Sequence, residues 1–200
     1  MTQQEDINKT EQIEEKPSRV KEVFEWVEVV VSAMFAVVII FTLLFRVATI
    51  IGDSMENTFF EGQKVIITNW FYTPKAGDVV VVSRNAQNNA FADDDQGPII
   101  KRVIATEGQQ VNIDFVTGIV YVDGVALDEP YTKTPTNLKY DVDFPVYVPE
   151  GHIFCLGDNR NESLDSRSSR IGNGGMIDTR YVLGKVTLRI LPLDKFGGVD

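Results

Sequence analysis

The chain has 200 residues, which suits one main domain plus an anchor, and its formal net charge is −10. A strongly acidic chain without a basic stripe binds nucleic acid poorly, so we expect no nucleic-acid partner. One cysteine and one histidine exclude an internal disulfide and a closed zinc site built from these two residue types.

The N-terminal part reads as a tail followed by a membrane anchor. Residues 1–25 begin with a polar, charged stretch typical of a disordered tail. No residue from Val29 to Phe45 is charged, and Trp26 and its neighbours extend this run to the roughly 20 residues that span a bilayer. We therefore predict a transmembrane anchor at 26–48. A cleaved signal peptide and a buried core helix are the alternatives, but the run is long and starts late.

Positive charges near the anchor predict its orientation. Lys16, Arg19 and Lys21 closely precede the apolar run, and Arg46 and Lys64 follow it. This Lys/Arg count favours a cytoplasmic N-terminus and a plasma-membrane protein that crosses once. The folded part would then be extracytoplasmic.

Residues 49–200 show the pattern of a β domain. Short β-branched or apolar runs alternate with turn residues, and Asp123-Gly124 between two such runs is typical of a tight hairpin. We see no amphipathic helix in this part, so we predict a mainly β, barrel-like domain after a single N-terminal helix. The predicted strands are Lys64–Thr68, Asp78–Val82, Ile99–Ala105, Val111–Phe115, Ile119–Val122, Val125–Leu127, Ile153–Leu156 and Tyr181–Leu188.

Two other features have ordinary explanations. The loop Arg84–Pro98 contains Asp93-Asp94-Asp95, but it lacks the ligand spacing and glycine of a calcium-binding EF-hand, so we interpret it as a solvated acidic loop. Cys155 lies in an apolar, strand-like run, where a cysteine usually acts as a small buried hydrophobe.

Ser54 follows the predicted anchor in a turn that Gly52 permits, because glycine accepts backbone conformations that a side chain obstructs. The serine could be an ordinary turn residue. As a nucleophile it would need a base. The candidates are His152, which is the only histidine, and a lysine whose burial favours the neutral amine.

Lys101 is placed to be that lysine. Side chains alternate along a strand, so Lys101 shares a face with Ile99 and Val103. The alternative is a lysine at a strand edge with its ammonium group in water. The polar stretch Gly157–Arg167 is either a solvated loop or a set of hydrogen-bonding groups around such a base.

Three stretches in this order resemble the bacterial type I signal peptidases, which are membrane-anchored Ser/Lys endopeptidases. They are Gly52–Thr58, Lys101–Ala105 and Gly157–Arg167, with further likeness at Gly77–Val80 and Glu129–Tyr131. The likeness runs from the anchor to about Leu188, and the ordered set is far more specific than any one member.

The resemblance implies roles for individual residues. Ser54 would be the nucleophile and its backbone N–H an oxyanion donor, and Lys101 would be the general base. Ser163 would hydrogen-bond the lysine amine. The remaining residues implied to support the site are the motif members Gly52, Asp53 and Met55 and the ion pairs Arg102–Asp158 and Asp165–Arg167.

The chain departs from the family pattern at two positions. Asn57 stands where many members have proline, which removes a constraint on φ. Gly52 stands where some members carry a serine whose hydroxyl assists the oxyanion hole, so that donor must be absent or supplied by another group.

The implied function is removal of N-terminal signal peptides from exported preproteins at the outer face of the membrane. The resemblance implies small residues, typically alanine, at the first and third positions before the cut, and no cofactor or metal. One alternative is a related Ser/Lys peptidase with a dedicated exported substrate. Another is a catalytically idle, membrane-anchored β domain that binds a partner, although the presence of Ser54 and Lys101 argues against it.

Four aromatic residues near Ser54 suggest contact with the lipid bilayer. Phe59, Phe60, Trp70 and Phe71 could form an apolar rim that dips into the membrane interface. The alternative is that they are ordinary core residues.

Overall fold

The computed structural model describes residues 19–83 and 97–199, in two compact units that divide between Leu43 and Leu44. Most of the predicted tail and of the acidic loop at Arg84–Pro98 lies outside the described residues.

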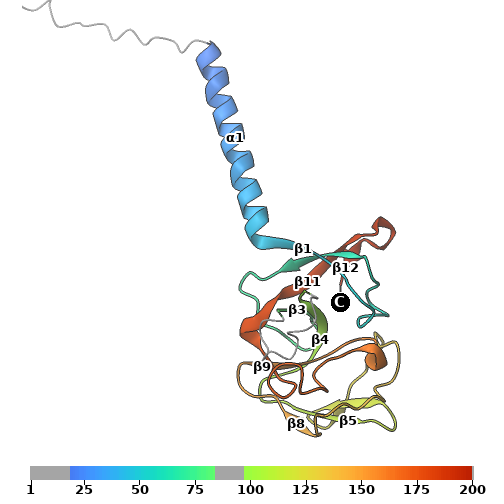
Figure 1. The fold of residues 1–200 in the computed structure, drawn as a ribbon. Helices are drawn as coiled ribbons and strands as arrows, with labels where there is room; N and C mark the ends of the chain where they lie inside the picture. The colour runs from blue at the N-terminus through green and yellow to red at the C-terminus, as the bar shows by residue number, and fades with distance from the viewer. Residues whose placement is uncertain (1–18, 84–96, 200) are drawn as a thin grey trace, which may run out of the picture. The chain divides into compact units, whose positions relative to one another are not determined.

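The first unit contains one helix, α1 (Arg19–Leu44), drawn in blue in Figure 1. Its stretch Arg19–Thr42 has a mean hydropathy of 2.3 and buries none of its side chains, so it is long and apolar enough to cross a membrane. The helix starts inside the predicted tail. It ends at Leu44 because the next residues pair with a neighbouring strand, so the last residues of the predicted anchor belong to the sheet.

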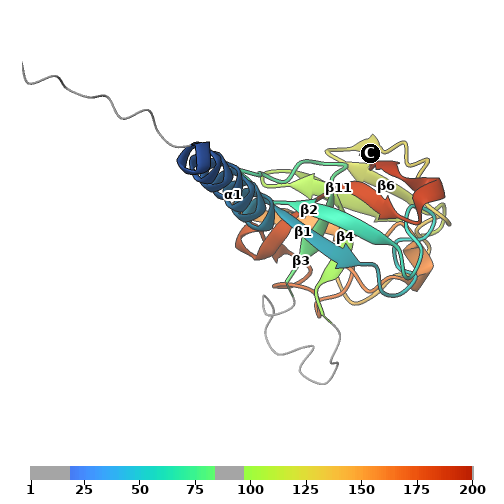
Figure 2. The same ribbon diagram turned by 90° about the horizontal axis from the view of Figure 1, so that it is seen from above.

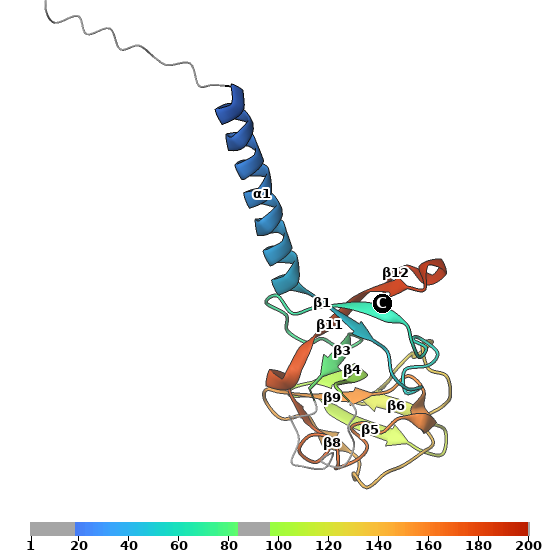
Figure 3. The same cartoon turned by 45° about the horizontal axis from the view of Figure 1, so that its top comes forward.

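The second unit is built from two antiparallel sheets, and the prediction of a mainly β fold after one N-terminal helix is confirmed (Figure 3). The larger sheet has the order β1 (Phe45–Thr49), β2 (Lys64–Thr68), β11 (Val182–Leu191), β3 (Val79–Val82), β4 (Ile99–Thr106), β9 (His152–Leu156) and β10 (Ile177–Asp178), with β12 (Gly197–Gly198) paired to β11. The smaller sheet has the order β7 (Val125–Ala126), β6 (Ile119–Val122), β5 (Gln110–Asp114) and β8 (Val146–Tyr147). Among the described residues, this unit also contains the short 3-10 helices η2 (Arg160–Glu162), η3 (Thr179–Tyr181) and η4 (Leu193–Lys195).

Apolar side chains on the strands form three clusters that fix this arrangement. One cluster joins the small sheet to the β4–β9 part of the large one through Val111, Val120, Ile104 and Phe154. The other two clusters contain valines that alternate along β3, because successive side chains of a strand point to opposite faces. All four β3 residues are buried, so β3 and the neighbouring β4 lie in the centre of the fold.

Strand β1 forms the edge of the large sheet and pairs only with β2 among the described strands. Figure 2, the view from above, shows β1 running alongside β2. Since β1 follows directly on the helix and precedes the turn with Ser54, it connects the anchor to the site.

The predicted aromatic rim is wrong for one of its four members. Phe59 is fully buried and packs in the core with Met55 and Ile50. Trp70 and Phe71 are 67% and 93% exposed, because they occupy the turn after β2. Phe60 is also exposed.

Candidate active site

The Lys101 side chain projects from β4 toward Ser54. Its Nζ donates a hydrogen bond to Ser54 Oγ at 2.8 Å and another to the carbonyl of Ile100 at 3.0 Å. Lys101 is only 4% exposed, which excludes the alternative of a solvated lysine at a strand edge. Ile99 and Val103 pack in one apolar cluster, as their shared face predicts. A buried amine beside a serine hydroxyl is the arrangement that a lysine base requires.

Ser54 lies in a loop that closes on itself. The amide of Ile50 donates to the carbonyl of Gln63 at 2.8 Å, and the amide of Gly62 donates to the carbonyl of Ile50 at 3.0 Å. Gly52 has a φ of +77°, a left-handed conformation that a side chain would strain. We call residues 50–63 the nucleophile loop.

The polar stretch Gly157–Arg167 contacts the nucleophile loop through Asn159. The Asn159 amide N–H donates to the carbonyl of Ser54 at 3.0 Å, and its Nδ2 donates to the carbonyl of Asp53 at 3.2 Å. Sequence reasoning gave Asn159 no role, although it lies inside the third motif. These two hydrogen bonds fix the backbone of the candidate nucleophile at the carbonyls of Asp53 and Ser54.

The predicted ion pair between Arg102 and Asp158 is present and buried. Arg102 Nε and Nη2 donate to the two carboxylate oxygens at 2.9 and 2.8 Å, and the side chains are 2% and 0% exposed. The Thr58 hydroxyl donates to the same carboxylate at 2.5 Å. The guanidinium carbon lies 3.9 Å from the centre of the Tyr131 ring. The pair therefore joins β4, the third motif and Thr58 of the nucleophile loop.

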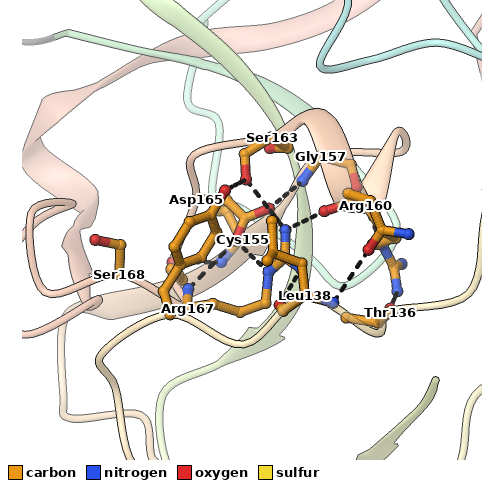
Figure 4. A network of polar contacts seen from close by, with 12 residues as sticks. Thr136, Leu138, Cys155, Gly157, Arg160, Ser163, Asp165, Arg167 and Ser168 are labelled. Atoms are coloured by element: carbon orange, nitrogen blue, oxygen red, sulfur yellow. Dashed lines mark hydrogen bonds and ion pairs between the residues drawn. The ribbon is translucent and has the colours of Figure 1, made fainter. Parts of the chain in front are cut away.

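The second predicted pair, Asp165–Arg167, supports the turn that follows β9 (Figure 4). Arg167 Nε and Nη2 donate to the Asp165 carboxylate at 2.8 and 2.9 Å, and both side chains are fully buried. Asp165 also accepts from the amide of Gly157 at 3.1 Å, and Arg167 donates to the carbonyl of Leu138 at 2.8 Å. Two buried opposite charges with these extra bonds keep the third motif in one conformation.

A third buried ion pair was not predicted. Arg160 forms two hydrogen bonds with the Glu129 carboxylate. It also donates to the Thr136 hydroxyl at 2.6 Å, and both of these residues are labelled in Figure 4. Its Nε donates to the carbonyl of Gly157 at 3.0 Å. Glu129 carried a signal only as part of the resemblance at Glu129–Tyr131, since nothing in its spacing points to Arg160.

Ser163 lies beside the site, but its expected hydrogen bond to Lys101 is not formed. The hydroxyl is fully buried and has no hydrogen-bond partner among the described residues. It faces Gly157 instead, where a side-chain carbon would lie 2.2 Å from Ser163 Oγ and 2.5 Å from the carbonyl oxygen of Ser54. Gly157 thus lets the serine and the nucleophile loop approach each other closely.

The competing base and the lone thiol lie elsewhere. His152 Nδ1 is 2.8 Å from the carbonyl oxygen of Glu150, and the ring lines a separate cavity of about 330 Å³ that does not include Ser54. Cys155 is buried as predicted, and burial raises the pKa of its thiol. In the described part of the chain, no three His, Cys, Asp or Glu side chains converge as metal ligands would.

Ser54 and Lys101 line a groove of about 590 Å³. Strand β1 and the start of the nucleophile loop form one wall, and its other lining residues are mostly aliphatic. Within the described residues, the Ser54 amide N–H forms no hydrogen bond, so it is free to donate to a bound carbonyl oxygen. The remaining lining residues are Ile67, Val81, Gly97, Pro98, Ile99, Ile100, Glu162, Leu164, Ile171 and Leu183.

Comparison with known proteins places these features in a family. A model of the family "Signal peptidase, peptidase S26" matches residues 23–191. Signal peptidase I of Bacillus licheniformis is 29% identical over 94% of this chain and 99% of its own length, and signal peptidase IB of Staphylococcus aureus (strain COL) is 31% identical over 88% and 93%. A crystal structure of a signal peptidase I from Enterococcus faecalis V583 overlays with a TM-score of 0.44 at 24% identity, over 58% of this chain and 98% of that chain.

Proposed function

We propose that Ser54 and Lys101 are the nucleophile and the base of this chain, which belongs to the signal peptidase family (peptidase S26). With these two groups the chain would cleave signal peptides. Members of this family are serine endopeptidases, and helix α1 is long and apolar enough to anchor this one in a membrane. The observation that carries the proposal is the 2.8 Å contact between Lys101 Nζ and Ser54 Oγ inside the groove.

The first chemical step is attack on the scissile carbonyl. A neutral Lys101 amine accepts the proton of the Ser54 hydroxyl, and Ser54 Oγ forms a bond to the carbonyl carbon. The carbonyl oxygen becomes an oxyanion, toward which the Ser54 amide N–H donates. Gly52 offers no side-chain donor at that position, so the backbone carries this contribution.

The second half of the reaction returns the enzyme to its starting state. The Lys101 ammonium gives its proton to the leaving amine, and the peptide bond breaks to leave an ester on Ser54. Lys101 then accepts a proton from a water molecule, whose oxygen forms a bond to the ester carbon. The acyl–Oγ bond breaks, the Lys101 ammonium returns its proton to Ser54 Oγ, and the signal peptide leaves with a new C-terminal carboxyl group. One lysine thus acts as base and acid in turn.

Burial of Lys101 explains why an amine can serve as base. Lys101 is almost completely buried, and removal of an amine from water disfavours its ammonium form. The hydrogen bond to the Ile100 carbonyl uses one N–H and directs the rest of the amine toward Ser54. The neutral amine can then receive the Ser54 proton over the same 2.8 Å.

The groove suits an extended peptide. Residues Arg46–Thr49 of edge strand β1 line one wall, and a peptide in β conformation can hydrogen-bond to the edge of a sheet. The aliphatic lining is compatible with apolar side chains next to the scissile bond. From the family resemblance, we expect cleavage after sequences with small residues, typically alanine, at the first and third positions before the cut.

The location of catalysis follows from chain reach. A fully extended chain from Arg46 to Ser54 spans at most about 29 Å, so Ser54 must lie near the membrane surface. We propose that the N-terminus is cytoplasmic and the catalytic domain extracytoplasmic. Protease added to cells with any outer barrier opened should then degrade the domain. Its complete protection would reverse the orientation.

Exposed aromatic side chains support lipid contact by the catalytic domain. Trp70 and Phe71 follow the end of β2 at which Thr68 pairs with Phe45, the first residue after the helix. We propose that this end of the sheet contacts the bilayer. Trp70→Ser/Phe71→Ser should weaken liposome binding by a form lacking residues 1–43, and unchanged binding would remove the idea.

The function is tested with a purified preprotein and the full chain in detergent. Mass spectrometry should find one cut at the end of the signal peptide, and Ser54→Ala should give no product while melting at the wild-type temperature. Product formation by Ser54→Ala would show that another residue is the nucleophile. The absence of any product from the wild-type chain would favour a binding role for the domain.

A further inference from the structure

Arg189 contacts the nucleophile loop although it lies on β11, outside the three motifs. Its Nη2 donates to the backbone carbonyl of Thr58 at 2.6 Å, and its guanidinium carbon lies 4.9 Å from the centre of the Phe59 ring. Phe59 is fully buried, and Arg189 Nε is buried without a partner among the described residues. The Arg189 guanidinium is therefore positioned by its contacts with Thr58 and Phe59.

Two separate hydrogen bonds therefore fix the position of Thr58. Its hydroxyl donates to Asp158, which is paired with Arg102, and its carbonyl accepts from Arg189. The amides of Thr58 and Phe59 both donate to the carbonyl of Met55, at 2.9 and 2.8 Å. Met55 directly follows Ser54, so a displacement of Thr58 is passed through these short bonds to the nucleophile.

The strand that carries Arg189 belongs to the same rigid sheet as the base. β11 pairs with β3, and β3 pairs with the strand that carries Lys101. The nucleophile loop, in contrast, lies between β1 and β2 and is not a strand of the sheet, and Ser54 Oγ accepts a hydrogen bond from Lys101 Nζ at 2.8 Å. A hydrogen bond from β11 to the loop thus fixes the loop against the frame that holds the base.

We propose that Arg189 is a positioning residue that keeps Ser54 within proton-transfer distance of Lys101. This inference rests on the proposed Ser/Lys chemistry. Its consequence is a loss of turnover without a matching loss of substrate binding, because Arg189 does not line the groove. A misplacement of about 1 Å at a reacting group can slow a reaction on the order of 100-fold.

The test compares three variants of the full chain in detergent. Arg189→Met keeps a long side chain against Phe59 but cannot donate to Thr58, and Arg189→Lys restores one cationic donor. Val120→Ala is the matched control, because it removes core packing in the small sheet, away from the loop. For each variant, kcat and KM on a preprotein are measured well below the melting temperature.

We expect Arg189→Met to lower kcat about tenfold or more with KM changed less than about threefold, and Arg189→Lys to recover part of the loss. Val120→Ala should lower the melting temperature but leave kcat unchanged. If Arg189→Met retains wild-type kcat, or if Val120→Ala loses as much kcat for an equal loss of stability, Arg189 has no positioning role.

Hydrogen exchange provides a readout that does not depend on activity. The amides of Thr58 and Phe59 should exchange faster in Arg189→Met than in the wild type or in Val120→Ala, because the loop loses its hold on β11. Unchanged exchange would refute the structural part of the proposal. If the wild type cleaves no preprotein, the proposed function fails, and the exchange result still decides whether Arg189 holds the loop.

Discussion

Replacing Gly157 by alanine should displace the nucleophile by a distance that the structure specifies. A Cβ at this position would lie 2.5 Å from the carbonyl oxygen of Ser54 and 2.5 Å from Ser163 Cβ, whereas ordinary contact begins at 3.4 Å. The Ser163 hydroxyl could rotate away, but neither of these two atoms can. The backbone of Ser54 or that of Gly157 must therefore move by about 0.9 Å, the difference between 3.4 and 2.5 Å.

This displacement should be felt mainly in turnover. A shift near 1 Å at a reacting group can cost on the order of 100-fold in rate, and overpacking a buried site typically costs about 1–3 kcal/mol of stability. We expect Gly157→Ala to fold with a reduced melting temperature and to lose about 100-fold in kcat on a preprotein. The assay is steady-state cleavage with a thermal melt of each preparation.

Gly197→Ala is the matched control, since a side chain there meets nothing within 4 Å and the residue shows no left-handed φ. It should have wild-type activity and stability. Wild-type kcat in Gly157→Ala would refute the reasoning, because it would mean that the third motif and Ser54 can separate by this distance without effect on catalysis.

Two ion pairs give the remaining predictions. Arg102→Met leaves the buried Asp158 carboxylate without its cation, so it should destabilise the domain by about 3–5 kcal/mol in urea denaturation, and a loss below 1 kcal/mol would contradict the buried pair. Burial raises the pKa of Asp78, but hydrogen bonds from Lys185 and Tyr72 outweigh it, and the pKa falls below its ordinary 3.8. Because the folded-state pKa is lowered, the ionised carboxylate stabilises the fold above pH 3.8, and this stability is lost as the pH falls through the lowered pKa. The wild type should therefore lose more stability than Asp78→Asn on acidification below pH 3.8. Equal acid sensitivity of the two forms would count against the Asp78–Lys185 pair.

Local sequence patterns predicted much of the fold. Lys64–Thr68 forms a strand with the predicted bounds, because its alternating β-branched residues Val65 and Ile67 pack together in the core on one face of the sheet. Strand β1 was missed because Val47 and Ala48 were assigned to the anchor and no turn residue separates the strand from the helix. Only pairing with β2 shows where the helix ends.

The site was predictable to the extent that its residues belong to recognisable stretches. The face shared by Lys101, Ile99 and Val103 follows from strand alternation, and the structure confirms that Lys101 is buried. The pairing of Arg102 with Asp158 came only from the family resemblance, since no spacing rule links residues so far apart. The structure confirms that pair.

The contacts of Asn159 and Arg189 with the nucleophile loop could not be predicted. Asn159 donates to two backbone carbonyls. Every residue has a backbone carbonyl, so the sequence does not show which carbonyl a side chain will bind. Arg189 lies one residue beyond the last predicted strand, Tyr181–Leu188, whereas β11 continues to Leu191. Its position against Thr58 depends on the register of β11, which is irregular beside it. Such contacts appear only once the sheet is assembled.

The central claim, that Lys101 rather than His152 is the base, is tested most directly by the pH dependence of kcat/KM in three forms of the full chain. Wild type and His152→Ala should show the same rise in kcat/KM as the pH increases and the lysine loses its proton, and Lys101→Arg should be inactive at every pH because a guanidinium stays protonated. An inactive His152→Ala together with an active Lys101→Arg would contradict the claim and would assign the base to histidine.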